Sequence, residues 1–310
     1  MTTEPSCLPP AFEEPLALSA PLARAWAARH CAHAPGGGCD HYHGFWQHLR
    51  LMGLGATLGG HPQRYLRAMS DLARRWAGAG TDGGVAARRV LVSGTADYSM
   101  LAHVAAAFHG GAGAMPQLHV LDLCPTPLRL NEWYARRTGL VVQTVCADLL
   151  AHEAPQGYDL VVTSSLLGYF SPAQRPALFA RLAALLRPGG CLMFSNRLRP
   201  GLPAQPLAQT ETALQRLADA VAARVPGLPA QAALDSGTAM DAARAYAGHR
   251  RPYPLDGADT LRALAQGAGL QWLQCEAVGG ESAAAPGTPG GPTLADGSPY
   301  VFVTLGRPAA

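Results

Sequence analysis

Short apolar segments alternate with stretches of helical periodicity between residues 88 and 195 of this chain. The first apolar segment, Arg89–Ser93, ends in a glycine turn, and four more follow at 118–123, 141–145, 158–164 and 191–195. Continuous apolar runs of this length are typical of strands buried on both faces of a parallel sheet. Because a helical stretch lies between most of them, the pattern predicts an α/β fold, a doubly wound parallel sheet with helices on both faces.

The chain continues this pattern at its C-terminal end. Residues 270–276 and 300–305 predict two last strands, separated by Gly/Pro/Ala-rich sequence at 279–299 that we expect to be a loop. They complete a mostly parallel seven-stranded sheet whose last strand is antiparallel. Residues 203–250 predict further helices, broken by prolines.

Residues 1–84 have a different character. Helical periodicity follows Pro21, Asp40 and Pro62, and the glycine-rich stretch 78–84 ends the segment. We therefore predict an N-terminal helical segment over residues 1–84 and an α/β domain over residues 85–310.

Composition excludes several functions. All 24 basic residues are Arg, so Schiff-base and P-loop lysines are excluded. The net charge is only +3 and the arginines are scattered, which disfavours a nucleic-acid partner. The chain lacks a signal peptide and any run of 18 apolar residues, so we expect a cytoplasmic protein with no membrane span and reduced thiols at its seven Cys.

Polar groups follow three of the predicted strands. Gly94 after the first strand allows a tight turn before a helix N-terminus. Asp122 ends the second strand and Asp148 follows the third, where carboxylates can bind ribose hydroxyls and an adenine amino group. Each acid alone is equally typical of a turn or helix cap. Asp159, at the start of a strand, is expected to be structural.

This order of motifs resembles the class I S-adenosylmethionine-dependent methyltransferases over about residues 86–305. The matching pieces are Val90-Leu-Val-Ser-Gly94, Val120-Leu-Asp122, Ala147-Asp148, Tyr158-Asp-Leu-Val-Val162 and Leu185-Leu-Arg-Pro-Gly-Gly190. The resemblance implies S-adenosylmethionine as cofactor and a cofactor site formed by Ser93, Gly94, Thr95, Asp97, Asp122, Leu123, Asp148, Leu149 and Ser164. One departure is clear: only Gly94 remains of the family's three glycines, Val92 replaces its acid, and Asp97 is a substitute for that acid.

Within this resemblance the N-terminal helices are expected to cover a small-molecule pocket, as they do in many small-molecule methyltransferases. On one continuous helix from Asp40, His43, Gln47 and Arg50 would share one side, beside Tyr42 and Trp46. The predicted substrate-binding residues are Tyr42, Trp46, Gln47, Arg50, Tyr169, Arg250 and Tyr253. The predicted bases are His43, His41 and His249.

Three alternatives stay open at this point. Cys31, His33, Cys39 and His43 include suitable zinc ligands, but their irregular spacing leads us to predict no metal. A nicotinamide-dependent dehydrogenase is disfavoured because the loop lacks Gly-x-Gly-x-x-Gly. A catalytically degenerate binding or scaffold subunit is the stronger rival, given the departures in the first loop. A homodimer is also left open.

Overall fold

The computed structural model describes residues 8–31, 38–54, 61–78, 87–110, 114–278 and 299–309. Among these residues the strands form one seven-stranded sheet, in the order β3-β2-β1-β4-β5-β7-β6. Its strands are β1 (Arg89–Ser93), β2 (Gln117–Asp122), β3 (Val142–Cys146), β4 (Tyr158–Ser164), β5 (Leu186–Arg197), β6 (Gln271–Val278) and β7 (Tyr300–Gly306). Only β7 runs antiparallel to its neighbours, as predicted.

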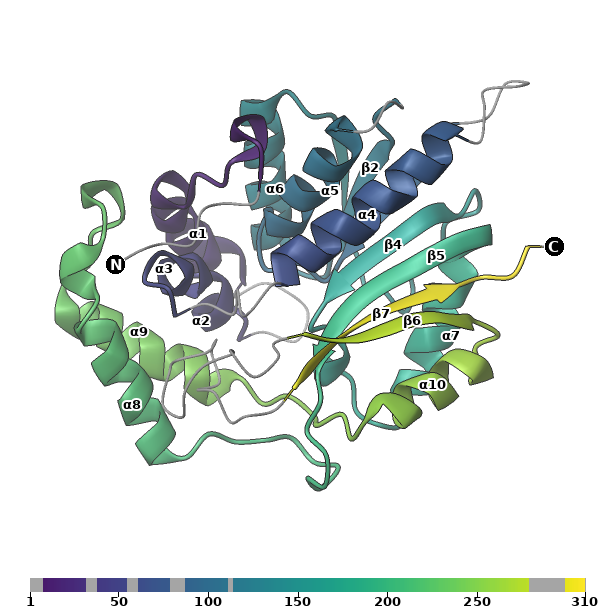
Figure 1. Ribbon diagram of the computed structural model, residues 1–310. Helices are drawn as coiled ribbons and strands as arrows, with labels where there is room; N and C mark the ends of the chain where they lie inside the picture. The colour runs from purple at the N-terminus through teal and green to yellow at the C-terminus, as the bar shows by residue number, and fades with distance from the viewer. Residues whose placement is uncertain are drawn as a thin grey trace.

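Helices cover both faces of this sheet (Figure 1). On one face lie α4 (His61–Gly78), α5 (Ser99–His109) and α6 (Pro125–Thr138). On the other lie α7 (Arg175–Leu185) and α10 (Ala258–Gly267). Alternate residues of β1 show why: Val90 and Val92 pack toward the first group of helices, whereas Leu91 packs toward the second. Because helices cover both faces of the sheet, its central strands must be apolar on both faces.

A second group of helices lies beyond one end of the sheet (Figure 1). It combines the N-terminal helices α1 (Leu16–His30), α2 (Asp40–His43) and α3 (Trp46–Leu51) with α8 (Glu211–Ala222) and α9 (Ser236–His249). Phe45 and Leu49 of the N-terminal part pack with Val221 and Tyr246 of the later part in a separate hydrophobic cluster. We call α1–α3 with α8 and α9 the lid, because these helices face the carboxyl ends of the parallel strands.

The helix expected from Asp40 is interrupted. The chain forms α2, turns at Gly44 and Phe45, and resumes as α3. A Cβ on Gly44 would meet the carbonyl oxygen of Asp40 at 2.7 Å and the Cβ of Ala27 at 3.3 Å, so α1 approaches the turn closely. The expectation of one continuous helix that carries His43, Gln47 and Arg50 is therefore wrong.

The division of the chain at residue 84 stays a prediction, but one helix before it belongs to the sheet. In α4, Tyr65, Met69 and Leu72 are buried in the same core as α5. Tyr65 also donates a 2.6 Å hydrogen bond to the carbonyl oxygen of Thr163 in β4. The lid part of the N-terminal segment is therefore α1–α3. The expected linker at 78–84 and loop at 279–299 fall almost wholly outside the described residues.

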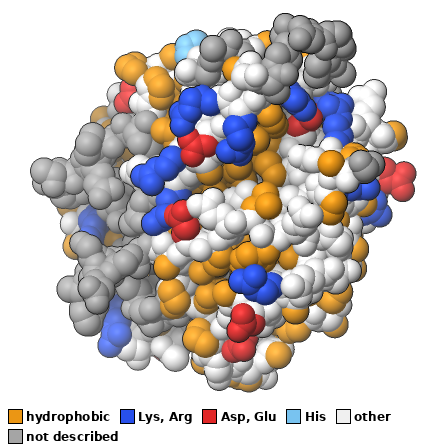
Figure 2. Space-filling view, turned by 45° about the vertical axis from the view of Figure 1, so that its right-hand side comes forward, with side chains coloured by type: hydrophobic (Ala, Val, Ile, Leu, Met, Phe, Trp, Pro, Cys, Tyr) orange, Lys and Arg blue, Asp and Glu red, His pale blue; other side chains and the backbone are white. Residues whose placement is uncertain are grey.

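The surface of the molecule mixes charges of both signs. On the face shown in Figure 2, Arg side chains lie beside acidic ones, with apolar side chains between them.

None of the described helices is both long enough and apolar enough to span a membrane.

Candidate functional site

A cavity of about 720 Å³ lies between the lid and the carboxyl ends of β1 to β4. This volume is in the range of pockets that bury a small-molecule ligand. All nine residues predicted to bind the cofactor line it: Ser93, Gly94, Thr95, Asp97, Asp122, Leu123, Asp148, Leu149 and Ser164. The resemblance thus selected residues that the fold brings to one place.

Gly94 forms the turn between β1 and α5. Its φ is +63°, and a Cβ at this position would lie 2.6 Å from Cδ1 of Leu166. Its N–H donates a 3.0 Å hydrogen bond to the carbonyl oxygen of Leu121. The positive φ therefore favours glycine here, and a larger residue would also force the end of the Leu166 side chain to move. The two other family glycines are replaced without a comparable consequence for the turn.

Asp122 connects the first two strand ends. Its Oδ2 accepts a 3.0 Å hydrogen bond from the N–H of Thr95, and its Oδ1 accepts one of 2.8 Å from the N–H of Cys124. Burial raises the pKa of Asp122 to about 6, although nearby His43 and these N–H groups act against the shift. Each carboxylate oxygen can accept more than one hydrogen bond, so the carboxylate is held in place with capacity left for a ligand.

Asp148 is exposed at the mouth of the cavity. Its Oδ1 accepts a 2.9 Å hydrogen bond from the N–H of Leu150 and so caps the turn after β3. The deeper wall carries two hydroxyls, Ser93 Oγ and Thr163 Oγ1, that are buried without a hydrogen-bond partner among the described residues. Buried hydroxyls without a partner are uncommon, and they mark a wall prepared for a polar ligand.

Asp97 has a different set of partners from the one expected. Its Oδ2 lies 3.1 Å from Nη1 of Arg50 and 3.3 Å from Nε2 of Gln47, and its Oδ1 accepts from the N–H of Ser99 at 2.8 Å. Arg50 also pairs with Glu14 at 2.8 Å. Asp97 therefore links the lid to the loop after β1. Gln47 contributes to this link and does not line the cavity.

The lid side of the cavity is aromatic. Tyr42 stacks on Trp46, with ring centroids 5.9 Å apart, and on Tyr246, at 5.4 Å. The guanidinium of Arg250 lies 5.9 Å from the Tyr42 ring. Burial raises the pKa values of Tyr42 and Tyr246, so both phenols keep their protons at neutral pH. Tyr169, which is 55% exposed, adds to the wall.

Two buried polar atoms in this wall have no hydrogen-bond partner among the described residues. They are the hydroxyl of Tyr246 and Nε of Arg250. Tyr246 was not among the predicted substrate-binding residues, although its position one helical turn before Arg250 was a usable signal. Tyr253 was expected here, but its backbone pairs with Gly168 and Arg175 and its side chain does not line the cavity.

The three predicted bases have different surroundings. His249 lines the cavity, and its Nδ1 lies 2.9 Å from the carbonyl oxygen of Ala245. The ring of His41 packs against that of His249, tilted by 30° with centroids 4.2 Å apart, and His41 is not part of the cavity wall. His43 lies on the wall, but its Nδ1 is 3.4 Å from the sulfur of Cys31.

His43 belongs to a cluster that the spacing of the chain did not reveal. Its imidazole and the sulfurs of Cys31, Cys39 and Cys124 have their ligand atoms within 4.8 Å of one another. His33, which was considered with this group, lies outside the described residues. Cys124 was missed because it is 93 residues from Cys31, although it follows Asp122 by only two positions.

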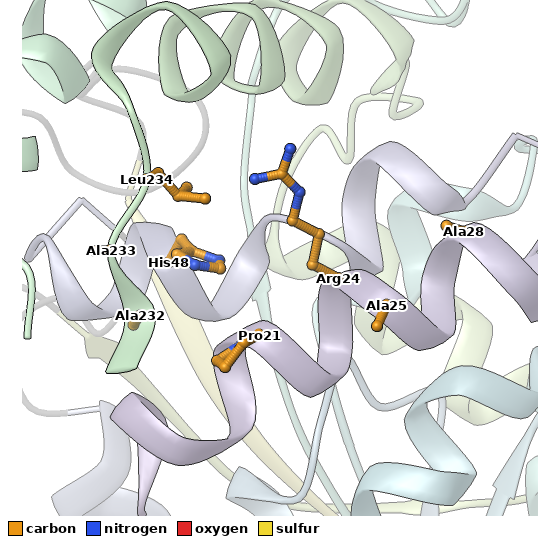
Figure 3. Close-up of a pocket in the computed structure, with 8 residues that line it drawn as sticks. All are labelled: Pro21, Arg24, Ala25, Ala28, His48, Ala232, Ala233 and Leu234. Atoms are coloured by element: carbon orange, nitrogen blue, oxygen red, sulfur yellow. The ribbon is translucent and has the colours of Figure 1, made fainter. Parts of the chain in front are cut away.

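A second, smaller hollow of about 350 Å³ lies on the outer side of the lid (Figure 3). It is lined by Pro21, Arg24, Ala25, Ala28, His48, Ala232, Ala233 and Leu234. Figure 3 shows the side chains of Arg24 and His48 pointing into the space between α1 and the segment that carries Ala232. Burial lowers the pKa of His48 to about 4, helped by the positive charge of Arg24. This hollow contains no acid or thiol, and we assign it no chemistry.

Comparison with known proteins agrees with the geometry of the large cavity. Residues 94–190 match a family described as methyltransferase domain. These residues are therefore similar to a methyltransferase domain. The match begins at Gly94, directly after β1, and ends at Gly190, so it includes the carboxyl ends of β2 to β4 and the acids predicted to bind the cofactor.

Two relatives of the methyltransferase domain add to this finding. A carboxy-S-adenosyl-L-methionine synthase from Stutzerimonas stutzeri (strain A1501) is 43% identical over 60 residues, which are 19% of this chain and 24% of that protein. The 1,6-didemethyltoxoflavin-N1-methyltransferase from Burkholderia thailandensis has a TM-score of 0.50 at 15% identity, covering 96% of this chain and 93% of that one. The likeness to the second protein establishes the fold.

A further solved structure, a sarcosine dimethylglycine methyltransferase-like protein from Galdieria sulphuraria, has a TM-score of 0.49 at 14% identity. It covers 84% of this chain and 97% of that chain.

The residues of the cavity fit S-adenosylmethionine, the cofactor that the resemblance implies. The turn at Gly94 and the N-terminus of α5 suit the methionine part. Asp122 is held where a ribose diol can donate to it, and Asp148 lies at the mouth of the cavity beside Leu149. The unpartnered hydroxyls of Ser93 and Thr163 add polar groups to the same wall.

Proposed function

We propose that this chain transfers a methyl group from S-adenosylmethionine to an oxygen, nitrogen or sulfur atom of a small molecule with an aromatic or other planar apolar part. The observation that carries the proposal is the division of the cavity. One end has the loop of Gly94 with Asp122 and Asp148, and the other has stacked aromatic rings beside Arg250.

At the cofactor end the residues bind and orient. S-adenosylmethionine supplies an electrophilic methyl group on a sulfonium sulfur. Asp122 would accept the ribose hydroxyls, because its carboxylate is already fixed by the N–H groups of Thr95 and Cys124. Asp148 would accept from the adenine amino group. Asp97 would act indirectly, since Arg50 and Gln47 already occupy one of its oxygens.

At the acceptor end the residues favour a flat molecule with an acidic or hydrogen-bonding group. The rings of Tyr42, Trp46 and Tyr246 would stack against an aromatic acceptor. Arg250 could bind a carboxylate or phenolate of the acceptor. The same group could accept a hydrogen bond from the buried hydroxyl of Tyr246. Alignment of the acceptor with the methyl group accounts for most of the expected catalysis.

We propose His249 as the base that takes the proton from a hydroxyl or ammonium acceptor. It lines the cavity, and its Nδ1 can donate to the carbonyl oxygen of Ala245, which would leave Nε2 as the acceptor. The ring of His41, which packs against that of His249, would restrict its orientation. A positioned base contributes about 10²- to 10⁴-fold, so His249→Ala should lower turnover within that range.

The test combines binding and product identification. Calorimetry with S-adenosylmethionine should show binding, and incubation with methyl-labelled cofactor and a panel of aromatic acids, phenols and amines should yield a labelled product by mass spectrometry. His249→Ala should bind the cofactor normally and turn over slowly. Binding without any labelled product over the panel would favour the degenerate binding subunit, and absence of binding would contradict the proposal outright.

A further inference from the structure

Three thiols and an imidazole meet at the junction of the lid and the sheet. Cys31 follows the last residue of α1, Cys39 directly precedes α2 and His43 ends it, and Cys124 directly precedes α6. The Sγ of Cys31 lies 3.4 Å from the Sγ of Cys124 and 3.4 Å from Nδ1 of His43. Cys31 is fully buried, and the exposed fractions of Cys124 and His43 are 3% and 7%.

We propose that Cys31, Cys39, His43 and Cys124 bind one Zn²⁺ ion. Three cysteine sulfurs and one histidine nitrogen are among the ligand sets of tetrahedral zinc sites. With Zn–S near 2.3 Å and Zn–N near 2.0–2.1 Å, a tetrahedron separates sulfurs by about 3.8 Å and sulfur from nitrogen by about 3.6 Å. The two distances of 3.4 Å lie within a few tenths of an ångström of these values, and the 4.8 Å limit on the whole group is compatible with them.

Other accounts of the cluster fit the geometry less well. A disulfide requires sulfurs about 2.05 Å apart, and Cys31 and Cys124 are at 3.4 Å. A purely apolar role for the thiols does not explain why an imidazole nitrogen faces them. Thr126 Oγ1 lies 3.2 Å from the sulfur of Cys31 and can donate to it, a contact that suits a thiolate ligand.

The donor set also selects the metal. Thiolate and imidazole favour zinc over magnesium or calcium, which prefer oxygen ligands. No carboxylate is part of the group of four. Because all four positions of a tetrahedron would be filled by protein atoms, the ion has no open position for a substrate, and its role is structural.

The position of the site indicates what it stabilises. Three ligands come from the lid and one, Cys124, from the loop after β2, with 93 positions separating Cys31 from Cys124. The N–H of Cys124 donates a 2.8 Å hydrogen bond to Asp122. The ion would therefore fasten the lid to the loop that holds the carboxylate at the cofactor end of the cavity.

The experiment measures metal on the intact protein and on matched variants. Protein produced with added zinc is analysed by elemental mass spectrometry, and its zinc environment by X-ray absorption. Cys31→Ser and Cys124→Ser remove ligands, whereas Cys275→Ser, on β6, is the control thiol. We expect one zinc per chain in the wild type and in Cys275→Ser, and a loss of at least tenfold in zinc affinity in each ligand variant.

Three measurements on the wild type do not depend on the folding of the variants. X-ray absorption on the wild type should fit three sulfurs and one nitrogen, and Co²⁺ in place of zinc should give thiolate-to-cobalt charge-transfer absorption and tetrahedral d–d bands. Chelation should lower the thermal unfolding midpoint. Less than 0.1 zinc per chain, on the order expected for chance contamination, would overturn the proposal, as would oxygen-rich coordination or equal zinc in the ligand variants. None of these readouts requires methyl transfer, so a negative methylation assay does not contradict the proposed zinc site.

Discussion

The guanidinium of Arg50 in α3 donates to the carboxylate of Asp97 across 3.1 Å, and so joins the lid to the loop after β1. The same guanidinium contacts Glu14 at 2.8 Å, and the Arg50 side chain is only 6% exposed. Attraction to both acids raises the pKa of Arg50 in spite of its burial. One buried cation thus compensates two acidic groups.

Arg50→Met should destabilise the protein by about 3–5 kcal/mol, because it leaves buried carboxylates without their cation. Chemical denaturation followed by circular dichroism measures this. Arg244→Met is the matched control: Arg244 pairs with Glu211 at the surface, and its loss should change stability by less than about 1 kcal/mol. Equal effects in the two variants would contradict the assigned role of Arg50.

Asp122→Ala should weaken S-adenosylmethionine binding by about 100-fold or more, because two hydrogen bonds to a charged acceptor are each worth about 1.5–3 kcal/mol. Isothermal calorimetry measures the dissociation constant. Asp159→Asn is the comparison: Asp159 pairs with Arg88 and Arg187 at 2.9 Å, and lies outside the cavity wall. That variant should lose stability and keep its affinity. An unchanged dissociation constant in folded Asp122→Ala would exclude the carboxylate from the cofactor site.

Gly94→Ala should cost stability in two ways. The φ of +63° disfavours a side chain by about 1–2 kcal/mol, and the end of the Leu166 side chain must also move, which adds a smaller cost. Gly139→Ala separates the two contributions, since Gly139 has a φ of +70° and a Cβ added there would meet no atom within 4 Å. Thermal unfolding should therefore show a smaller loss in Gly139→Ala. Calorimetry should show weaker cofactor binding in Gly94→Ala alone.

Because of His48, the free energy of unfolding should decrease as the pH is lowered from about 6.5 to about 4. Burial lowers the pKa of His48 to about 4 from an ordinary value near 6.5. Between pH 6.5 and pH 4, His48 is therefore protonated in the unfolded chain but neutral in the folded chain, and this difference favours unfolding. The loss is absent above pH 6.5 and approaches about 3 kcal/mol near pH 4. Denaturation midpoints measured at several pH values should show a flatter dependence in His48→Gln than in the wild type. Parallel curves for the two proteins would show that His48 does not govern the effect.

Arg250→Met should raise the KM for an anionic acceptor about tenfold to a hundredfold, since a charge-assisted hydrogen bond is lost. The KM for S-adenosylmethionine should change little, because Asp122 and Asp148 lie at the other end of the cavity. Steady-state kinetics with each substrate varied in turn measures both values. Arg251→Met, whose side chain is exposed next along the chain, serves as control. A rise in both KM values alike would point to a general disturbance of the lid.

The fold and the cofactor end of the cavity followed from the sequence because their determinants are local. Each buried strand is a continuous apolar run, and in a parallel sheet the residues after successive strands meet at one edge. Hence Gly94, Asp122 and Asp148 could be placed together from their order alone. The helices on both faces followed from periodicity in the same way.

The aromatic end of the cavity and the cluster of Cys31, Cys39, His43 and Cys124 were decided by tertiary structure. The break at Gly44 divided the expected helix; His43 contacts Cys31, whereas Gln47 donates to Asp97. Tyr246 joined Tyr42 only when the later helices packed on the N-terminal ones. Cys124 met Cys31 and His43 across long separations. Spacing along the chain reports neighbours within one helix or at one sheet edge, and it contains no information on how a lid closes over that edge.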